Sequence, residues 1–384
     1  MSGEAYPRLV QACAEVAADP GAYAASWKAR RPEGRVIGYF PTYVPTELII
    51  AAGALPVGMW GGPVSVSLAN AYIQQFTCSI LRSTTEYALK GSLAALDGAL
   101  FPPMCDAVKL VSSSWSLNFS DRFYIDMVNL PERLDSGASV AYLAAELRRV
   151  AKALGQRLTR PISDESLRTA IAACNRVRQL QQAFYRWRKT PTGAVATLAE
   201  VSSILKAGTV MDSAEYAATL QRFLDASAAP LAAAAKSAAV PIVVTGLPCQ
   251  LPHTNILELF EPSGLRVVND DLFLGMRACG DISLAGDPYE NIARAFVASQ
   301  PLATRYHSGR PRHELVLDQV REGGAKGVVF MIPKFCEAEW FDLRYLKQEL
   351  AQRNIPSIAI DFEENPGGTG PVQTRLEAFA ETLA

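Results

Sequence analysis

The chain has 384 residues, of which 49% are hydrophobic and 20% charged, so it can bury a large core and is not expected to be disordered. It carries 37 basic and 38 acidic residues without a basic block, which argues against nucleic acid as its main partner. We find no signal core and no uncharged stretch long enough to span a bilayer, so we expect a soluble, cytoplasmic protein that does not enter the membrane.

Hydrophobic periodicity divides the chain into four regions. Residues 1–34 are predicted to form an N-terminal helical arm, and residues 35–135 alternate strands and helices as a first Rossmann-like unit. Residues 136–238 are almost wholly helical in pattern, and residues 239–384 form a second Rossmann-like unit. Strands that alternate with helices build parallel sheets. We therefore predict an α/β protein with two Rossmann-like parallel-sheet units, a helical insertion between them and an N-terminal helical arm.

The two units have similar predicted elements. In the first unit the strands are expected at 35–40, 55–60, 96–101 and 123–128, with helices at 44–53, 83–91 and 107–118. In the second unit the strands are expected at 240–245, 265–269, 327–332 and 357–360, with helices at 254–263, 288–299, 314–323, 339–353 and 374–383.

Three cysteines, Cys78, Cys105 and Cys336, stand where a cysteine has little structural reason to be. Cys105 and Cys336 share one pattern, in which a strand-like run meets proline, then a cysteine, an acidic residue and a helix. Both thiols should follow the C-terminal end of a strand, where open α/β sheets bind ligands. Helix N-termini supply N–H groups and a positive dipole end, which stabilise thiolates and anionic clusters. The acidic residues, Asp106 and Glu337, are assigned to helix capping.

Several chemistries lack their sequence motifs. There is no G-x-x-x-x-G-K-[ST], so we do not expect this chain to hydrolyse ATP itself. The motifs G-x-G-x-x-G after the first strand, G-x-S-x-G, H-E-x-x-H and C-x-x-C are also missing. The three histidines, His253, His307 and His313, are too scattered to suggest a histidine-based metal site.

These exclusions leave one chemistry, the ligation of a metal centre by cysteine thiolates that lie far apart in the sequence. Three thiolates can hold an iron–sulfur cluster and leave one iron open to another ligand, or they can hold zinc with an open position. Cys249 also follows a predicted strand and could line the cleft or act as a fourth ligand. Cys13 and Cys174 lie in alanine-rich helical patterns and are interpreted as core residues, and Cys279 as structural.

Other side chains near these positions have competing interpretations. Arg82, four residues after the first of the three cysteines, could donate hydrogen bonds near a cluster or coenzyme A, or form a surface ion pair. Tyr39 and Trp60 could wall the cleft, but core packing is the better interpretation. The pair Asp270 and Asp271 is expected to fix a loop rather than to bind a metal ion.

Seven stretches of the sequence together carry a family resemblance. They are GYFPTYVPTELI at 38–49, AGALPVG at 52–58, CSILRS at 78–83, LDGALFPPMCD at 96–106, VNDD at 268–271, PKFC at 333–336 and TRLEAF at 374–379. With these stretches the chain resembles the benzoyl-CoA reductase / 2-hydroxyacyl-CoA dehydratase family over essentially its full length. In length and in these segments it is most similar to the smaller cluster-bearing subunit of ATP-dependent benzoyl-CoA reductase.

The resemblance implies one [4Fe–4S] cluster bound through Cys78, Cys105 and Cys336. It implies a related larger cluster-bearing subunit as partner, and ATP-hydrolysing electron-activating subunits fed by a low-potential electron donor such as ferredoxin. It further implies an oxidoreductase of anaerobic aromatic degradation. Such an enzyme reduces the ring of an aromatic acyl-CoA, benzoyl-CoA, to a cyclic dienoyl-CoA by low-potential single-electron transfer.

Two alternatives stay open at this point. The dehydratase branch of the same family eliminates water from a 2-hydroxyacyl-CoA through a ketyl radical, and its electron is recycled rather than consumed. A non-catalytic subunit that carries a cluster or acts as a scaffold, while its partner holds the substrate, is also consistent with the sequence.

Overall fold

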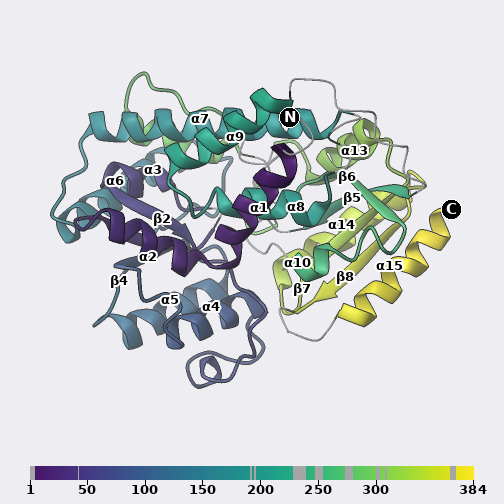
Figure 1. The fold of residues 1–384 in the computed structure, drawn as a ribbon, viewed down its shortest axis with the longest axis horizontal. Coiled ribbons are helices and arrows are strands. Elements are labelled where there is room, and N and C mark those ends of the chain that lie inside the picture. Colours follow the sequence, from purple (N-terminus) through teal and green to yellow (C-terminus); the bar gives the residue numbers. More distant parts are fainter. Residues whose placement is uncertain are drawn as a thin grey trace.

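The computed structural model describes residues 5–41, 43–190, 193, 196–227, 239–246, 254–272, 280–299, 303–307, 309–363 and 369–384. Figure 1 shows two lobes, each built around a parallel sheet, with helices α7 and α9 along the top. The described residues contain two four-stranded sheets, and this confirms the predicted α/β class with an N-terminal helical arm.

The first lobe contains a parallel sheet in the order β2-β1-β3-β4. Its strands are β1 (Arg35–Tyr39), β2 (Ala54–Gly58), β3 (Gly98–Phe101) and β4 (Tyr124–Met127). Its helices are α3 (Thr46–Ala51), α4 (Ser79–Leu89) and α5 (Asp106–Phe119), with a short 3-10 turn η2 (Ala69–Ala71) before α4. The two central strands are almost wholly buried, as expected for a parallel sheet covered on both faces.

The second lobe repeats this strand order as β6-β5-β7-β8, again parallel. Its strands are β5 (Val240–Gly246), β6 (Leu265–Asp270), β7 (Gly327–Pro333) and β8 (Ser357–Phe362). Its helices are α10 (Thr254–Leu257), α13 (Arg312–Gly323), α14 (Glu337–Ala351) and α15 (Thr369–Leu383). The helix predicted over 254–263 is therefore shorter than expected, because turns follow Leu257.

The N-terminal arm consists of two helices rather than one. α1 (Ala5–Ala18) ends before Asp19, whose side chain accepts a hydrogen bond from the Ala22 N–H as the N-cap of α2 (Pro20–Arg30). Pro20 suits the first turn of a helix, where its missing N–H costs nothing. The helical insertion contains α6 (Ser139–Arg157), α7 (Asp164–Arg188), α8 (Leu198–Ala207) and α9 (Ser213–Ser227).

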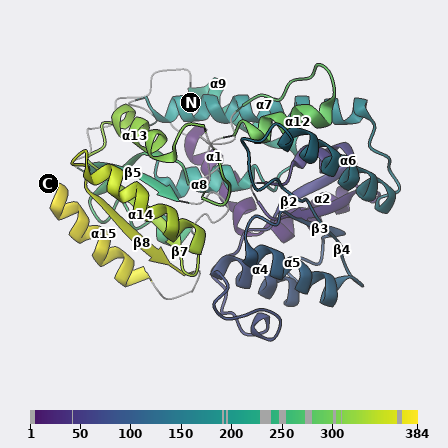
Figure 2. The same cartoon turned by 180° about the vertical axis from the view of Figure 1, so that it is seen from behind.

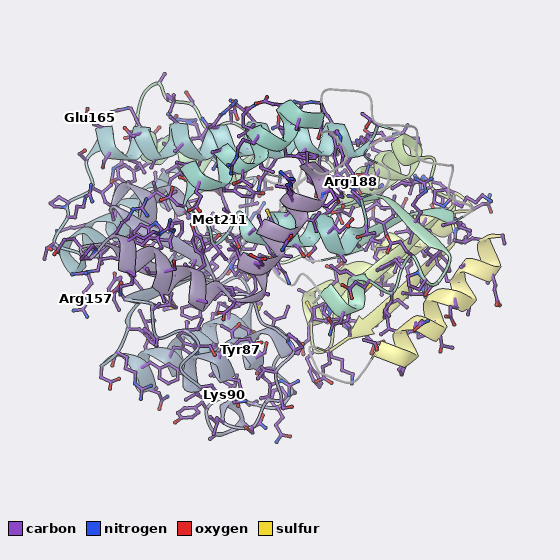
Figure 3. The ribbon with its side chains drawn as sticks, viewed as in Figure 1. Tyr87, Lys90, Arg157, Glu165, Arg188 and Met211 are labelled. Atoms are coloured by element: carbon purple, nitrogen blue, oxygen red, sulfur yellow. The ribbon has the colours of Figure 1, made fainter. Side chains whose placement is uncertain are left out.

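Helix α7 connects the two lobes through buried ion pairs. Near its middle, Arg178 pairs with Glu47 of α3 in the first lobe. At its end, Arg188 pairs with Asp270 of β6 in the second lobe and donates to the Val267 carbonyl at 3.2 Å. Arg188 is labelled in Figure 3, near the junction of the lobes. Removing one partner of a buried pair is strongly destabilising, so these contacts fix the lobes relative to each other.

After β6 the chain returns to the first lobe. Helix α12 (Pro288–Val297) lies beside α6 in Figure 2, and Arg148 of α6 pairs with Asp287, the N-cap residue of α12. Farther on, the Tyr306 N–H donates to the Glu132 carbonyl at 3.1 Å, and the Leu134 N–H donates to the Tyr306 carbonyl at 2.9 Å. Residues 303–307 therefore lie against the loop that follows β4.

The strand order identifies where each sheet can bind a ligand. In both sheets the connection changes direction between the two central strands, β1 and β3 in one lobe and β5 and β7 in the other. Ligands of open α/β sheets bind at the carboxyl ends of such strands. The segments that leave β3 and β7 at these ends carry Cys105 and Cys336.

Candidate functional site

Cys78, Cys105 and Cys336 are the N-cap residues of α4, α5 and α14. Each sulfur therefore stands at the positive end of a helix, near backbone N–H groups that have no partner within the helix. None of the five described cysteines forms a disulfide bond. The prediction that a thiol follows the end of β3 and of β7 at a helix start is confirmed for Cys105 and Cys336.

Burial is the largest influence on the pKa values of the three thiols. Only 2% of Cys78 and 7% of Cys336 is exposed, and Cys105 is partly buried. Burial raises the pKa of Cys78 to about 12, and it also raises the pKa of Cys105 and of Cys336. Backbone N–H groups of the helix starts act in the opposite direction on each pKa. The helix ends favour thiolates here, but burial outweighs them.

The three thiols are close enough to act on one another. The charge of Cys105 would raise the pKa of Cys78, and the charges of Cys78 and Cys105 would both raise the pKa of Cys336. Two cysteines come from the first lobe and one from the second. Three thiolates at this junction would repel each other, so they need a cationic centre between them.

The spacing of the thiols does not form a site for one metal ion. Within the described part of the chain, no three side chains of His, Cys, Asp or Glu are grouped so that they could hold a metal ion. A polynuclear cluster requires less close grouping, because each thiolate binds a different iron. The donor chemistry of three cysteine thiolates suits a cluster with one open iron, and the zinc alternative from the sequence stays a prediction.

The long loop before Cys78 is held against α4. Glu86 of α4 is buried, and its carboxylate accepts hydrogen bonds from the backbone N–H groups of Ser67 at 3.1 Å and Ala69 at 2.9 Å. Gly61 packs so closely that an added Cβ would lie 2.3 Å from the Ser83 hydroxyl. These contacts place Cys78 at the helix start, four residues earlier than the sequence indicated.

Arg82 connects the two lobes beside the cysteines. Its guanidinium pairs with Glu363, which follows β8 and also accepts a hydrogen bond from the Lys334 ammonium at 3.3 Å. Its Nε donates to the Thr77 carbonyl at 3.0 Å, directly before Cys78. Arg82 thus forms an ion pair, but the pair lies largely buried between the lobes rather than on the surface as expected, and the same side chain donates a hydrogen bond beside Cys78.

Two arginines that the sequence did not single out also contact the site. Arg305 donates to the Pro103 carbonyl at 3.3 Å and to the Met104 carbonyl at 3.2 Å, directly before Cys105. Arg312 pairs with Glu339, which is fully buried in the first turn of α14. Both contacts join residues far apart in the chain, so no local spacing indicates them.

The remaining candidates fall into three groups. Asp106 and Glu337 are the first residues of their helices rather than N-caps, because the cysteines occupy the N-cap positions. Cys249 and Cys279 lie outside the described residues. The structural interpretations are confirmed for buried residues Cys13, Cys174, Tyr39 and Trp60, and Asp270 serves an ion pair with Arg188.

Two surface cavities have no cysteine in their lining. One of about 450 Å³ is lined by residues that include Arg148, Lys152 and Tyr289, where α6 and α12 meet. The other, of about 420 Å³, is lined by residues that include Arg310 and Arg353. Neither cavity therefore belongs to the cysteine site.

Among the described helices, none is long and apolar enough to cross a membrane.

The fold and the cysteine site together define a class of protein. The family described as "2-hydroxyglutaryl-CoA dehydratase, D-component" matches residues 41–383, and the chain belongs to this family. The predicted resemblance to benzoyl-CoA reductase and 2-hydroxyacyl-CoA dehydratase subunits is confirmed.

Individual relatives come from both branches of the family. The chain is 32% identical to a benzoyl-CoA reductase subunit of Thauera aromatica over 365 residues, which cover 94% of each chain. It is 27% identical to the (R)-phenyllactyl-CoA dehydratase beta subunit of Clostridium sporogenes, covering 91% of this chain and 92% of the relative. It is also 27% identical to the beta subunit of (R)-2-hydroxyglutaryl-CoA dehydratase of Acidaminococcus fermentans, covering 98% and 99%. All three relatives are named as subunits.

Proposed function

We propose that this chain is the [4Fe–4S]-bearing subunit of an ATP-dependent aromatic acyl-CoA reductase of the benzoyl-CoA type. The observation that carries the proposal is the arrangement of Cys78, Cys105 and Cys336 at three helix N-termini where the lobes meet. The branch within the family is favoured by the 32% identity to a benzoyl-CoA reductase subunit, against 27% for the two dehydratase subunits.

The roles of the chain's own residues follow from their positions. The three cysteines would hold three irons as thiolates and leave the fourth iron open to another ligand. The N–H groups at the starts of α4, α5 and α14 would stabilise the thiolates, and burial would keep water from the site. When bound, a cluster of this kind supplies single electrons at low potential, which reduction of an aromatic ring requires.

The proposal requires partners. The chain has no P-loop motif, so ATP-hydrolysing electron-activating subunits must drive the electron uphill. A related larger cluster-bearing subunit would complete the reductase, and a donor such as ferredoxin would supply the electrons. We place this assembly in the cytoplasm, where the acyl-CoA substrate is available.

The proposal is tested by anaerobic iron and sulfide analysis with EPR on the chain co-purified with its partners. Wild type is compared with Cys105→Ser and with Cys174→Ser, a buried cysteine in the middle of α7 that serves as the matched control. We expect the Cys105 variant to lose about four irons and about four sulfides per chain, and the Cys174 variant to keep them. An unchanged Cys105 variant, or no iron under strict anoxia, would contradict the cluster assignment.

A dehydratase function is the second candidate, because the family description and two of the relatives carry that name. The two reactions differ in electron use. A reductase consumes two electrons for each ring that it reduces, whereas the dehydratase recycles its electron. Counting reductant consumed per acyl-CoA converted therefore distinguishes them: near-zero consumption with steady turnover would favour the dehydratase.

A further inference from the structure

Each of the three cysteines lies in a segment that one arginine binds. Arg82 donates to the carbonyl before Cys78, at 3.0 Å. Arg305 donates to the two carbonyls before Cys105, at 3.2 and 3.3 Å. Arg312 binds the side chain of Glu339, in the first turn of the helix that Cys336 caps. Arg82 and Arg305 therefore bind the residues that lead directly into Cys78 and Cys105, whereas Arg312 reaches the helix of Cys336 only through Glu339.

The three arginines differ in the negative charge that surrounds them. Arg82 faces Glu363, and Arg312 faces both Glu339 and Asp342, so these two are neutralised by close carboxylates. Arg305 has one carboxylate partner, Glu132 at 3.4 Å, among the described residues. That carboxylate is 70% exposed, whereas the Arg305 side chain is only 2% exposed.

Arg305 shares one further feature with Arg312. Its Nε is buried and has no hydrogen-bond partner among the described residues. Apart from the 3.4 Å contact with the exposed Glu132 carboxylate, its other donors go to backbone carbonyls, including that of Thr304 at 2.6 Å. Burying a guanidinium with neutral partners costs free energy, because desolvation of its charge is only partly compensated.

We propose that Arg305 is a positioning residue that places Cys105 and makes the reduction potential of the bound cluster less negative. The inference rests on the proposed function, because it requires a cluster on the three cysteines. The guanidinium group of Arg305 fixes the carbonyls of Pro103 and Met104, and these residues lead directly into Cys105 at the N-cap position of α5. Its positive charge, weakly neutralised and shielded from water, favours whichever redox state carries more negative charge.

The direction of the effect follows from charge alone. Reduction adds one negative charge at the site, so a nearby buried cation stabilises the reduced state. Removing that cation should make the reduction potential more negative. Removing the carboxylate of Glu132 should have the opposite and smaller effect, because water screens this exposed group.

The test is an EPR-monitored redox titration of the complete complex, with iron analysis of every variant. The variants are Arg305→Gln, which removes the charge, Arg305→Lys, which keeps it without the fork, and Glu132→Gln. We expect Arg305→Gln to be on the order of tenfold less reduced at a fixed potential, which is about 59 mV for a one-electron couple. We expect Arg305→Lys to keep a reduction potential near that of wild type. We expect the reduction potential of Glu132→Gln to be less negative.

The outcomes separate this inference from the proposed function. A wild-type chain that binds no cluster overturns both. A wild-type chain with its cluster, and a potential unchanged in Arg305→Gln, overturns the role of Arg305 alone. If Arg305→Gln fails to assemble the site, the reduction potentials of Arg305→Lys and Glu132→Gln test the role of Arg305 instead. A Glu132→Gln potential that is unchanged, or more negative than wild type, then counts against the proposal.

Discussion

Both lobes place a cysteine at the start of a helix that follows a central strand, but they do so with different local structures. In both, a proline stands at the end of a central strand or directly after it, and a cysteine caps the next helix. In the first lobe the residue before the cysteine, Met104, is 3% exposed with ordinary backbone geometry. In the second lobe the equivalent residue, Phe335, is 48% exposed and adopts a positive φ of 67°. The shared sheet topology determines where the thiol stands, but not how the turn is held.

The difference extends to what stabilises each turn. The turn before Cys105 is held by Arg305, which comes from a segment about 200 residues later in the chain. The helix start after Cys336 is held from within its own lobe, where Arg312 of α13 joins Glu339 to Thr245 and the Gly246 carbonyl at the end of β5. The second lobe therefore builds its half of the site independently, whereas the first depends on a distant segment.

The largest effect is expected for Arg312→Met, which tests the independence of the second lobe. The change leaves the fully buried carboxylate of Glu339 without its counter-charge. Breaking one side of a buried ion pair costs about 3–5 kcal/mol. We expect that loss in the free energy of unfolding, measured by urea denaturation of the full chain.

The double variant Arg312→Met/Glu339→Gln is the control for this prediction. It removes the stranded charge, so it should be more stable than Arg312→Met alone. Equal stability of the single and double variants would show that the buried charge is not what the arginine neutralises.

A smaller effect is expected for Arg82→Gln, which tests the contact between the lobes. The variant loses the partly buried pair with Glu363, and hydrogen bonds of charged groups contribute about 1.5–3 kcal/mol each, less where water screens them. We expect the free energy of unfolding to fall by about 1–2 kcal/mol, and the proposed cluster to be lost faster in air.

Arg321→Gln provides the matched control, because Arg321 is an exposed arginine in an ion pair within α13. It should change stability by less than about 0.5 kcal/mol. If the two variants lose iron at the same rate, the bridge between the lobes does not hold the site together.

Local patterns predicted much of this site, and distant contacts account for the rest. The sequence places Cys105 and Cys336 at strand ends because proline, cysteine and helix follow one another within a few residues. It places the start of α4 four residues too late, because the tertiary packing of Glu86 and Gly61 fixes that start. Nothing near Cys105 in the sequence indicates Arg305, since a contact across about 200 residues leaves no periodic pattern.

The smallest effect is expected at Phe335, where the difference between the two turns can be isolated. A non-glycine residue in the left-handed region costs about 1–2 kcal/mol, and glycine removes that cost while adding entropy to the unfolded chain. We therefore expect Phe335→Gly to stay within about 1 kcal/mol of wild type in urea unfolding and to keep its iron. Phe335→Val should be less stable than both, because a β-branched side chain suits this region poorly.

Met104→Gly is the counterpart in the first lobe, and it should cost several times more because it empties a buried position. Equal losses at the two positions would mean that the turns are held in the same way after all, and that the positive φ of Phe335 carries no energetic difference between the lobes.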